Sequence, residues 1–276
     1  MNRSDQTSKE SGVSETVGFI IIFGIMMAGI GLVALYGYPA LLNSQEEANI
    51  RNMERNMISL QSDVNALVYK SVPYKETTMQ VSGGVLSVKK PDKASSYFSI
   101  SVDSELLIDE SLFTEGKFPP GELHFLSDSG DRSIGLENGA VVYEQSGGSV
   151  MLSEPRWFIA SDPTGTKTLI ITLVQVDIDS SASVTATSGI STVQMSIEPK
   201  PIDGVSNSNI IAKSVDPNND VIYIEIYREN KYYTAWKNYF EYTLNMELEP
   251  ASISKFKIDG IDQVIIRAWK ITILNL

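Results

Sequence analysis

The chain has 276 residues, of which 42% are hydrophobic and 20% are charged, and its formal net charge is −12. The phosphate backbone of nucleic acids repels an acidic chain, and no cluster of lysine and arginine offsets this charge, so we expect no nucleic-acid partner. The sequence contains no cysteine, which excludes disulfides, thiolate catalysis and cysteine-bound zinc or iron–sulfur sites.

The first predicted element is a long apolar helix that follows a short polar leader. Positions 17–42, VGFIIIFGIMMAGIGLVALYGYPALL, contain no charged residue. A helix needs about 20 such residues to cross a bilayer core, whereas the apolar part of a cleaved secretory signal spans about 7–15 and ends at a small-residue site. The run therefore predicts a helix that inserts in a membrane, and an ordinary cleaved signal peptide is the less favoured alternative.

Small residues interrupt this apolar run. Gly24 and Ala28 lie four positions apart, a spacing that lets two helices approach closely in a bilayer or a bundle, and Gly18 precedes them. Glycine is also commoner in membrane helices than in soluble ones, which explains the same residues without a partner helix. Both interpretations stay open.

The helix is expected to continue past the apolar run with an amphipathic pattern. Apolar residues recur at spacings of three and four over positions 50–67, and no glycine or proline interrupts positions 40–71. This stripe consists of Ile50, Met53, Met57, Leu60, Val64 and Leu67. It can pack on the chain's own β domain, or on a second copy as a short coiled coil.

From residue 72 onward the sequence predicts strands. Short runs of period two are separated by turn residues: Gly83–Gly84 indicates one hairpin tip, and Asn138–Gly139 is the strongest turn signal. The expected fold class is α+β, with a long N-terminal membrane or stalk helix, an antiparallel β-sandwich-like domain and one short inserted helix.

The inserted helix is predicted at positions 230–244, where aromatic residues gather on one face. This face consists of Tyr232, Trp236, Tyr239 and Phe240. It either packs against the sheet or forms an exposed contact face for a glycan or a protein partner.

No catalytic or cofactor motif accompanies these elements, so we expect neither an enzyme nor a bound cofactor. The single histidine is His124, and neither G-x-S-x-G nor H-E-x-x-H occurs. Asp216, Asn218 and Asp220 follow the 1, 3, 5 spacing of a calcium loop. The sixth and twelfth positions of that loop are valine and tyrosine instead of glycine and glutamate, so a plain turn is the favoured interpretation.

The leader, the apolar helix and the segment after it resemble archaeal type IV pilin-like proteins. The likeness rests on GVSETVGFIIIFG, EEANIRNMERNMISLQSDVNAL and ETTMQVSGGVLSV, within the first 90 residues. The resemblance implies a class III signal, in which a prepilin-type peptidase removes the leader and the apolar helix is retained for a filament core. Residues 1–12 would be the leader, 13–42 the transmembrane or filament-core helix, 43–71 its amphipathic continuation and 72–276 an extracellular β domain.

The processing site departs from the family's usual pattern, in which the cut follows a charged residue and then a small one. A cut before Val13 follows Ser11–Gly12 and has no charge at the penultimate position, whereas a cut between Ser11 and Gly12 places Glu10 there. Both bonds stay open. Glu15 lies close after either bond, where the helix dipole favours a carboxylate. It either sets the axial register by pairing with a neighbour's amino terminus or lies at the membrane surface.

Two functional hypotheses follow. The first is a pilin-like subunit of an archaeal cell-surface type IV filament, which assembles with its own copies or other pilin-like subunits and displays the β domain for adhesion or surface contact. The alternative is a non-polymerising, membrane-anchored extracellular β-domain binding protein. Both place one helix in membrane lipid and the β domain at the cell surface. A tethered hydrolase is a third class, which no catalytic constellation supports.

Overall fold

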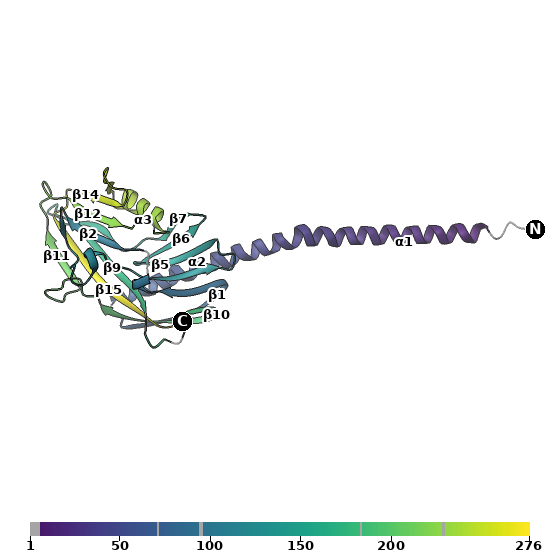
Figure 1. Cartoon of the computed structure of the whole chain (residues 1–276), viewed down its shortest axis with the longest axis horizontal. Helices are drawn as coiled ribbons and strands as arrows, with labels where there is room; N and C mark the ends of the chain where they lie inside the picture. Colours follow the sequence, from purple (N-terminus) through teal and green to yellow (C-terminus); the bar gives the residue numbers. More distant parts are fainter. Residues whose placement is uncertain (1–5, 71, 94–95, 183, 228–229) are drawn as a thin grey trace, which may run out of the picture. The chain divides into compact units, whose positions relative to one another are not determined.

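In a computed structural model of the chain, the described residues are 6–276 apart from 71, 94–95, 183 and 228–229 (Figure 1). For residues 6–15, 93 and 114 only the backbone is described. The chain divides into two compact units, Met1–Asn49 and Ile50–Leu276, which we call unit 1 and unit 2. The α+β class is confirmed, since a long N-terminal helix precedes a large mixed sheet and a short helix.

The helical part begins with α1 (Gln6–Leu32), continues through a π-helical turn η1 (Val33–Gly37) and proceeds as α2 (Tyr38–Lys70), whose residues from Ile50 on belong to unit 2. The backbone of predicted leader residues 6–12 is therefore helical as well. In the π turn, the N–H of Tyr38 donates to the carbonyl oxygen of Val33, five residues back. Pro39 follows at once, and the wider turn accommodates a residue that has no N–H and whose ring crowds the preceding turn.

Unit 2 contains a ten-stranded sheet, which we call sheet A. Its strand order is β7-β6-β5-β4-β1-β10-β15-β9-β8, and β11 also pairs with β15. The strands are β1 (Tyr74–Lys89), β4 (Glu122–Ser127), β5 (Arg132–Glu137), β6 (Ala140–Gln145), β7 (Gly148–Ser153), β8 (Phe158–Ser161), β9 (Lys167–Ile178), β10 (Ala186–Pro199), β11 (Ile210–Ser214) and β15 (Gln263–Asn275). Short 3-10 turns occur at η2 (Pro91–Lys93) and η3 (Thr114–Gly116).

One strand pair departs from the predicted antiparallel arrangement. β15 and β9 run parallel, from the pair Gln263↔Thr168 to the pair Ile273↔Ile178, whereas the other pairs of the sheet are antiparallel. A parallel pair needs a long connection, and the chain between these two strands supplies it. β9 is buried on both faces over most of its length, as is typical of parallel strands, so alternation could not reveal its direction.

The two glycine-containing turn signals have different outcomes. Asn138 and Gly139 both adopt positive φ values, 49° and 76°, and form the predicted turn between β5 and β6. The hairpin predicted at Gly83–Gly84 is wrong, because β1 continues through both residues with a register shift between Val81 and Leu86. A Cβ on Gly84 would lie 2.2 Å from the carbonyl oxygen of Leu126, so glycine permits a close strand approach at this bulge.

One face of sheet A packs on α2. The six residues of the predicted stripe are 0–4% exposed and join a core with apolar residues of β1, β4, β5, β9, β10 and β15. On the same helix, the Nε2 group of Gln61 donates to the carbonyl oxygens of Gly139 at 2.7 Å and Glu154 at 2.9 Å. The hypothesis that the stripe packs on the chain's own β domain is confirmed, and the stripe is not free for a coiled coil.

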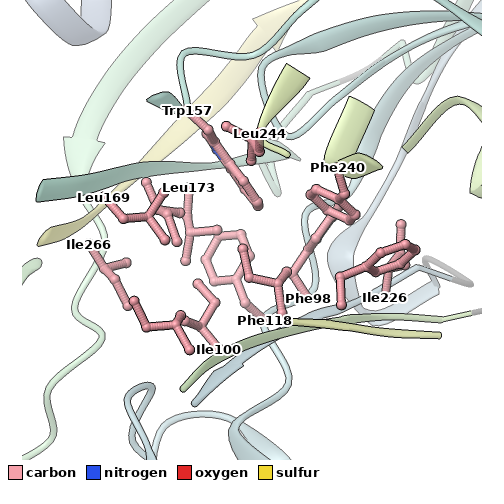
Figure 2. Packing of buried hydrophobic residues seen from close by; sticks show 14 of the residues in the cluster. Phe98, Ile100, Phe118, Trp157, Leu169, Leu173, Ile226, Phe240, Leu244 and Ile266 are labelled. Atoms are coloured by element: carbon pink, nitrogen blue, oxygen red, sulfur yellow. The ribbon is translucent and has the colours of Figure 1, made fainter. Parts of the chain in front are cut away.

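The other face of sheet A packs on a second sheet and the inserted helix. This sheet B has the order β13-β14-β12-β2-β3, with β2 (Phe98–Val102), β3 (Glu105–Leu106), β12 (Ile222–Ile226), β13 (Glu247–Leu248) and β14 (Lys255–Ile258). The inserted helix α3 (Tyr233–Asn238) continues into a π-helical turn η4 (Tyr239–Thr243). Figure 2 shows part of the core that they share, which contains Phe98 and Ile226 of sheet B, Leu169 and Ile266 of sheet A and Phe240 of η4.

Candidate functional site

The apolar helix of unit 1 exposes large apolar side chains on all sides. Those from Val17 to Leu42 are between 45% and 72% exposed, and no residue in this range is buried. Burial of apolar surface contributes about 25 cal/mol per Å², so a helix of this kind is stable where lipid or other helices cover it. The described residues include one helical segment long and apolar enough to cross a membrane, Thr16–Lys70, with a mean hydropathy of 2.6 over its most apolar window.

The predicted assembly residues do not all share one face of this helix. At about 100° per residue, Gly24 and Ala28 lie about 40° apart, whereas Gly18 lies about 120° from Gly24. A Cβ placed on Gly18 or Gly24 would meet no atom within 4 Å. No contact within the described part of unit 1 therefore requires glycine at these positions. Only a neighbouring helix of another molecule would require small residues there.

A hollow along the same helix was not singled out by the sequence analysis. It lies beside the small residues Gly29 and Ala34, and its lining is completed by Met26, Ile30, Val33 and Tyr38. The pair at positions 29 and 34 has a spacing of five, so a search for small residues four apart misses it.

Four predicted residues fall where only the backbone is described. Ser11, Gly12, Val13 and Glu15 lie within α1, and their side chains are outside the described ones. Processing at Ser11–Val13 and the registering role of Glu15 stay predictions.

The possible aromatic contact face is not exposed, since its four residues are buried. Tyr232, Trp236, Tyr239 and Phe240 are 0–3% exposed. Ring centroids lie 4.8 Å apart between Trp236 and Phe98, and 5.0 Å apart between Phe240 and Phe256. The alternative, in which this face packs on the sheets, is what the structure shows.

The calcium-like segment forms a closed turn between β11 and β12. The Oδ1 atom of Asp216 accepts the N–H of Asn218 at 3.0 Å, and its Oδ2 atom accepts the side-chain amide of Asn219 at 2.7 Å. The N–H of Asp216 donates to Oδ2 of Asp220 at 2.9 Å. Carboxylate oxygens therefore serve the turn itself. Within the described ranges, no group of three or more His, Cys, Asp or Glu residues is placed to hold a metal ion.

Sequence reasoning missed a buried charged cluster between sheet A and the segment before α3. Glu122 and Glu137 face each other as register partners on β4 and β5, and they are 5% and 3% exposed. The Oε1 atom of Glu122 lies 2.8 Å from Nζ of Lys89 and 3.2 Å from Nζ of Lys231. Burial raises the pKa of Glu122, but the charges of Lys231, His124 and Lys89 outweigh burial and hold that pKa below its ordinary value.

The pKa of Glu137 is shifted in the opposite direction to that of Glu122. Its Oε1 atom accepts the side-chain amide of Asn230 at 3.1 Å and the indole N–H of Trp236 at 3.0 Å. Burial, reinforced by the charge of Glu122, raises the pKa of Glu137 to about 7. Burial also lowers the pKa of His124 to about 4. These contacts join the segment before α3 and α3 itself to sheet A, and only the long-range pairing of β4, β5 and residues 230–236 could have revealed them.

Comparison with known proteins gives a family but no activity. The model of a family of unknown function, DUF7289, matches residues 12–273. An uncharacterized protein of Archaeoglobus fulgidus is 27% identical over 77 residues, which are 28% of this chain and 29% of the relative. The chain thus matches less than a third of the length of that curated relative. No solved structure matches.

Proposed function

We propose that this chain, which belongs to DUF7289, a family of unknown function, is a pilin-like subunit of an archaeal cell-surface filament, as its resemblance to archaeal type IV pilin-like proteins implies. In this proposal the apolar helix is retained after a prepilin-type peptidase removes the leader. The helix moves from membrane lipid into the core of the filament, and unit 2 is displayed for adhesion or surface contact.

The observation that carries the proposal is the contrast between the two parts of the helical segment. The stripe from Ile50 to Leu67 is buried by the chain's own β domain, whereas nothing within the described part of unit 1 covers residues 17–42. We therefore assign contacts with lipid or with other copies to residues 17–42, where small residues would let neighbouring helices approach closely. The start of the family match at residue 12, beside the predicted processing bonds, also supports the proposal.

A non-polymerising anchored protein uses the same membrane helix, so the decisive test separates assembly from insertion. Surface filaments are sheared from cells that produce the full chain, viewed by electron microscopy and mapped by mass spectrometry. We expect this chain among the filament subunits, starting at Gly12 or Val13 and retaining residues 17–42. Filaments that lack the chain, or a mature chain that starts after Leu42, would contradict the proposal.

Variants in the helix sharpen this test. Gly24→Leu adds a large side chain where helices are proposed to approach, and it raises apolarity, so membrane insertion is expected to persist while filament yield falls at least tenfold. Ile25→Leu, which conserves volume at the next position, is the matched control. Glu15→Ala tests the registering role against Glu47→Ala, an exposed glutamate beyond the apolar run. Equal filament yields for Gly24→Leu and Ile25→Leu would contradict a close approach of helices at Gly24.

A further inference from the structure

The outer face of sheet B carries a small polar pocket. Along β2 and β12 the core residues alternate with Ser99, Ser101, Tyr223 and Glu225, which therefore point away from sheet A. These strands and β14 are labelled in Figure 1. The pocket has a volume of about 280 Å³ and is lined by Ser99, Ser101, Asp103, Ser104, Leu106, Tyr223, Glu225 and Lys255.

Two serines with little exposed surface line this pocket. Ser99 is 8% exposed and Ser101 is 9% exposed, and they pair across the strands with Glu225 and Tyr223. In the described part of the chain no hydrogen bond engages either hydroxyl. Neither oxygen is among the described buried atoms that lack a partner, so both hydroxyls are open to the pocket and can bond to a molecule there.

The charged groups around the pocket are of both signs. The ammonium of Lys255 lies 4.0 Å from the centre of the Tyr223 ring, where it repels a cationic ligand. The carboxylates of Asp103 and Glu225 also line the pocket, and they repel an anionic ligand. Asp103 is fixed because its Oδ1 atom accepts the N–H of Val221 at 3.0 Å. A neutral ligand that both donates and accepts hydrogen bonds can use the carboxylates, the ammonium and the serine hydroxyls together.

We propose that this pocket binds one neutral sugar unit. Sugar hydroxyls donate to the carboxylates of Asp103 and Glu225 and exchange hydrogen bonds with the hydroxyls of Ser99 and Ser101, which act as donors or acceptors. The volume lies near the lower limit of small-molecule sites, which suits a single ring and not a longer chain of sugars. The pocket lies wholly within unit 2, so the inference does not depend on whether the apolar helix polymerises.

The test is a titration of the detergent-solubilised full chain with glucose, galactose, mannose and N-acetylglucosamine, followed by saturation-transfer NMR. At least one of these sugars is expected to bind with a millimolar Kd, as is ordinary for a single small ring. Replacing both serines, Ser99→Ala with Ser101→Ala, keeps the space but removes the hydroxyls, and should weaken binding about tenfold. Ser214→Ala, an exposed serine on β11, is the matched control and should bind like the unaltered protein.

A second variant covers the case in which the double replacement disturbs the fold. Ser101→Val fills the floor of the pocket with a residue that suits a strand, and it is expected to abolish binding while the circular dichroism spectrum is unchanged. The proposal is overturned if none of the four sugars binds the unaltered chain. It is equally overturned if a folded Ser101→Val variant binds a sugar as tightly as the Ser214→Ala control.

Discussion

Replacing Glu137 by glutamine tests the buried charged cluster through the pH dependence of stability. Glu137 is 3% exposed, and its pKa is raised from 4.5 to about 7 in the folded chain. Between these two values the folded state binds more protons than the unfolded state. The contribution of Glu137 is therefore fully present below pH 4.5 and is lost as the pH rises through 7, and the loss is about 3 kcal/mol.

His124 acts in the opposite direction over nearly the same range. Its pKa is lowered from 6.5 to about 4, so the unfolded state binds more protons between these values. Its contribution is fully present above pH 6.5 and is lost as the pH falls through 4, again by about 3 kcal/mol. In the unaltered protein the two groups nearly cancel between pH 4.5 and 6.5, and their sum changes little with pH.

Glu137→Gln removes one side of this balance. The amide oxygen can still accept from Asn230 and Trp236, so the packing of α3 is retained. The free energy of unfolding of the variant should rise by about 3 kcal/mol from pH 4 to 6.5, relative to the unaltered chain, because His124 is then unopposed. At pH 8 the variant should be the more stable of the two, since no buried charge has to form.

Urea unfolding followed by tryptophan fluorescence, at four pH values between 4 and 8, measures these differences, since Trp236 lies in the cluster itself. Glu110→Gln, at an exposed position, is the matched control and should follow the unaltered protein. Parallel pH profiles for Glu137→Gln and Glu110→Gln would refute the assignment of Glu137 as a protonated buried acid.

Two further predictions concern packing in unit 2. Met57→Ala should lower the free energy of unfolding by about 2–5 kcal/mol, because Met57 is 0% exposed and packs against sheet A. Ile58→Ala is the control and should lower it by less than about 1 kcal/mol, because Ile58 is 36% exposed. Equal losses in chemical denaturation would argue against burial of the stripe. Gly135→Ala should destabilise the protein by at least about 1–3 kcal/mol, since its Cβ would lie 2.1 Å from Oη of the buried Tyr232. Gly148→Ala is the control and should change the melting temperature little, because the nearest atom to its Cβ would lie 3.7 Å away. A Gly135→Ala variant as stable as the unaltered protein would contradict this packing.

The elements that could be predicted are those whose residues follow a local periodic pattern in the sequence. The spacing of Met53, Met57 and Leu60 indicates one face of a helix, and short apolar alternation indicates strands, because both patterns follow from backbone geometry alone. The Asn138–Gly139 turn was predictable for a similar reason, since a two-residue turn of this type needs positive φ at both positions.

What could not be predicted depends on which segments meet. The aromatic spacing around Trp236 defines a face of the inserted helix but not what covers it, and here two sheets cover it. Gly83–Gly84 has the composition of a turn, yet its neighbour Leu126 makes it a bulge. Glu122 and Glu137 look like ordinary polar strand positions, and their burial follows from a segment nearly a hundred residues away.

The position of β15 in sheet A has a consequence for how the chain is made. This strand lies between β10 and β9 and also pairs with β11, yet it follows the other nine strands of sheet A in the chain, so it is made after all of them. At about 5–20 residues per second, translation leaves β1 waiting for roughly 10–40 s before β15 emerges. Pairing between strands so distant in sequence is slow as well. From the time that β9 and β10 are made until β15 emerges, each has an open edge, and an open strand edge can pair wrongly.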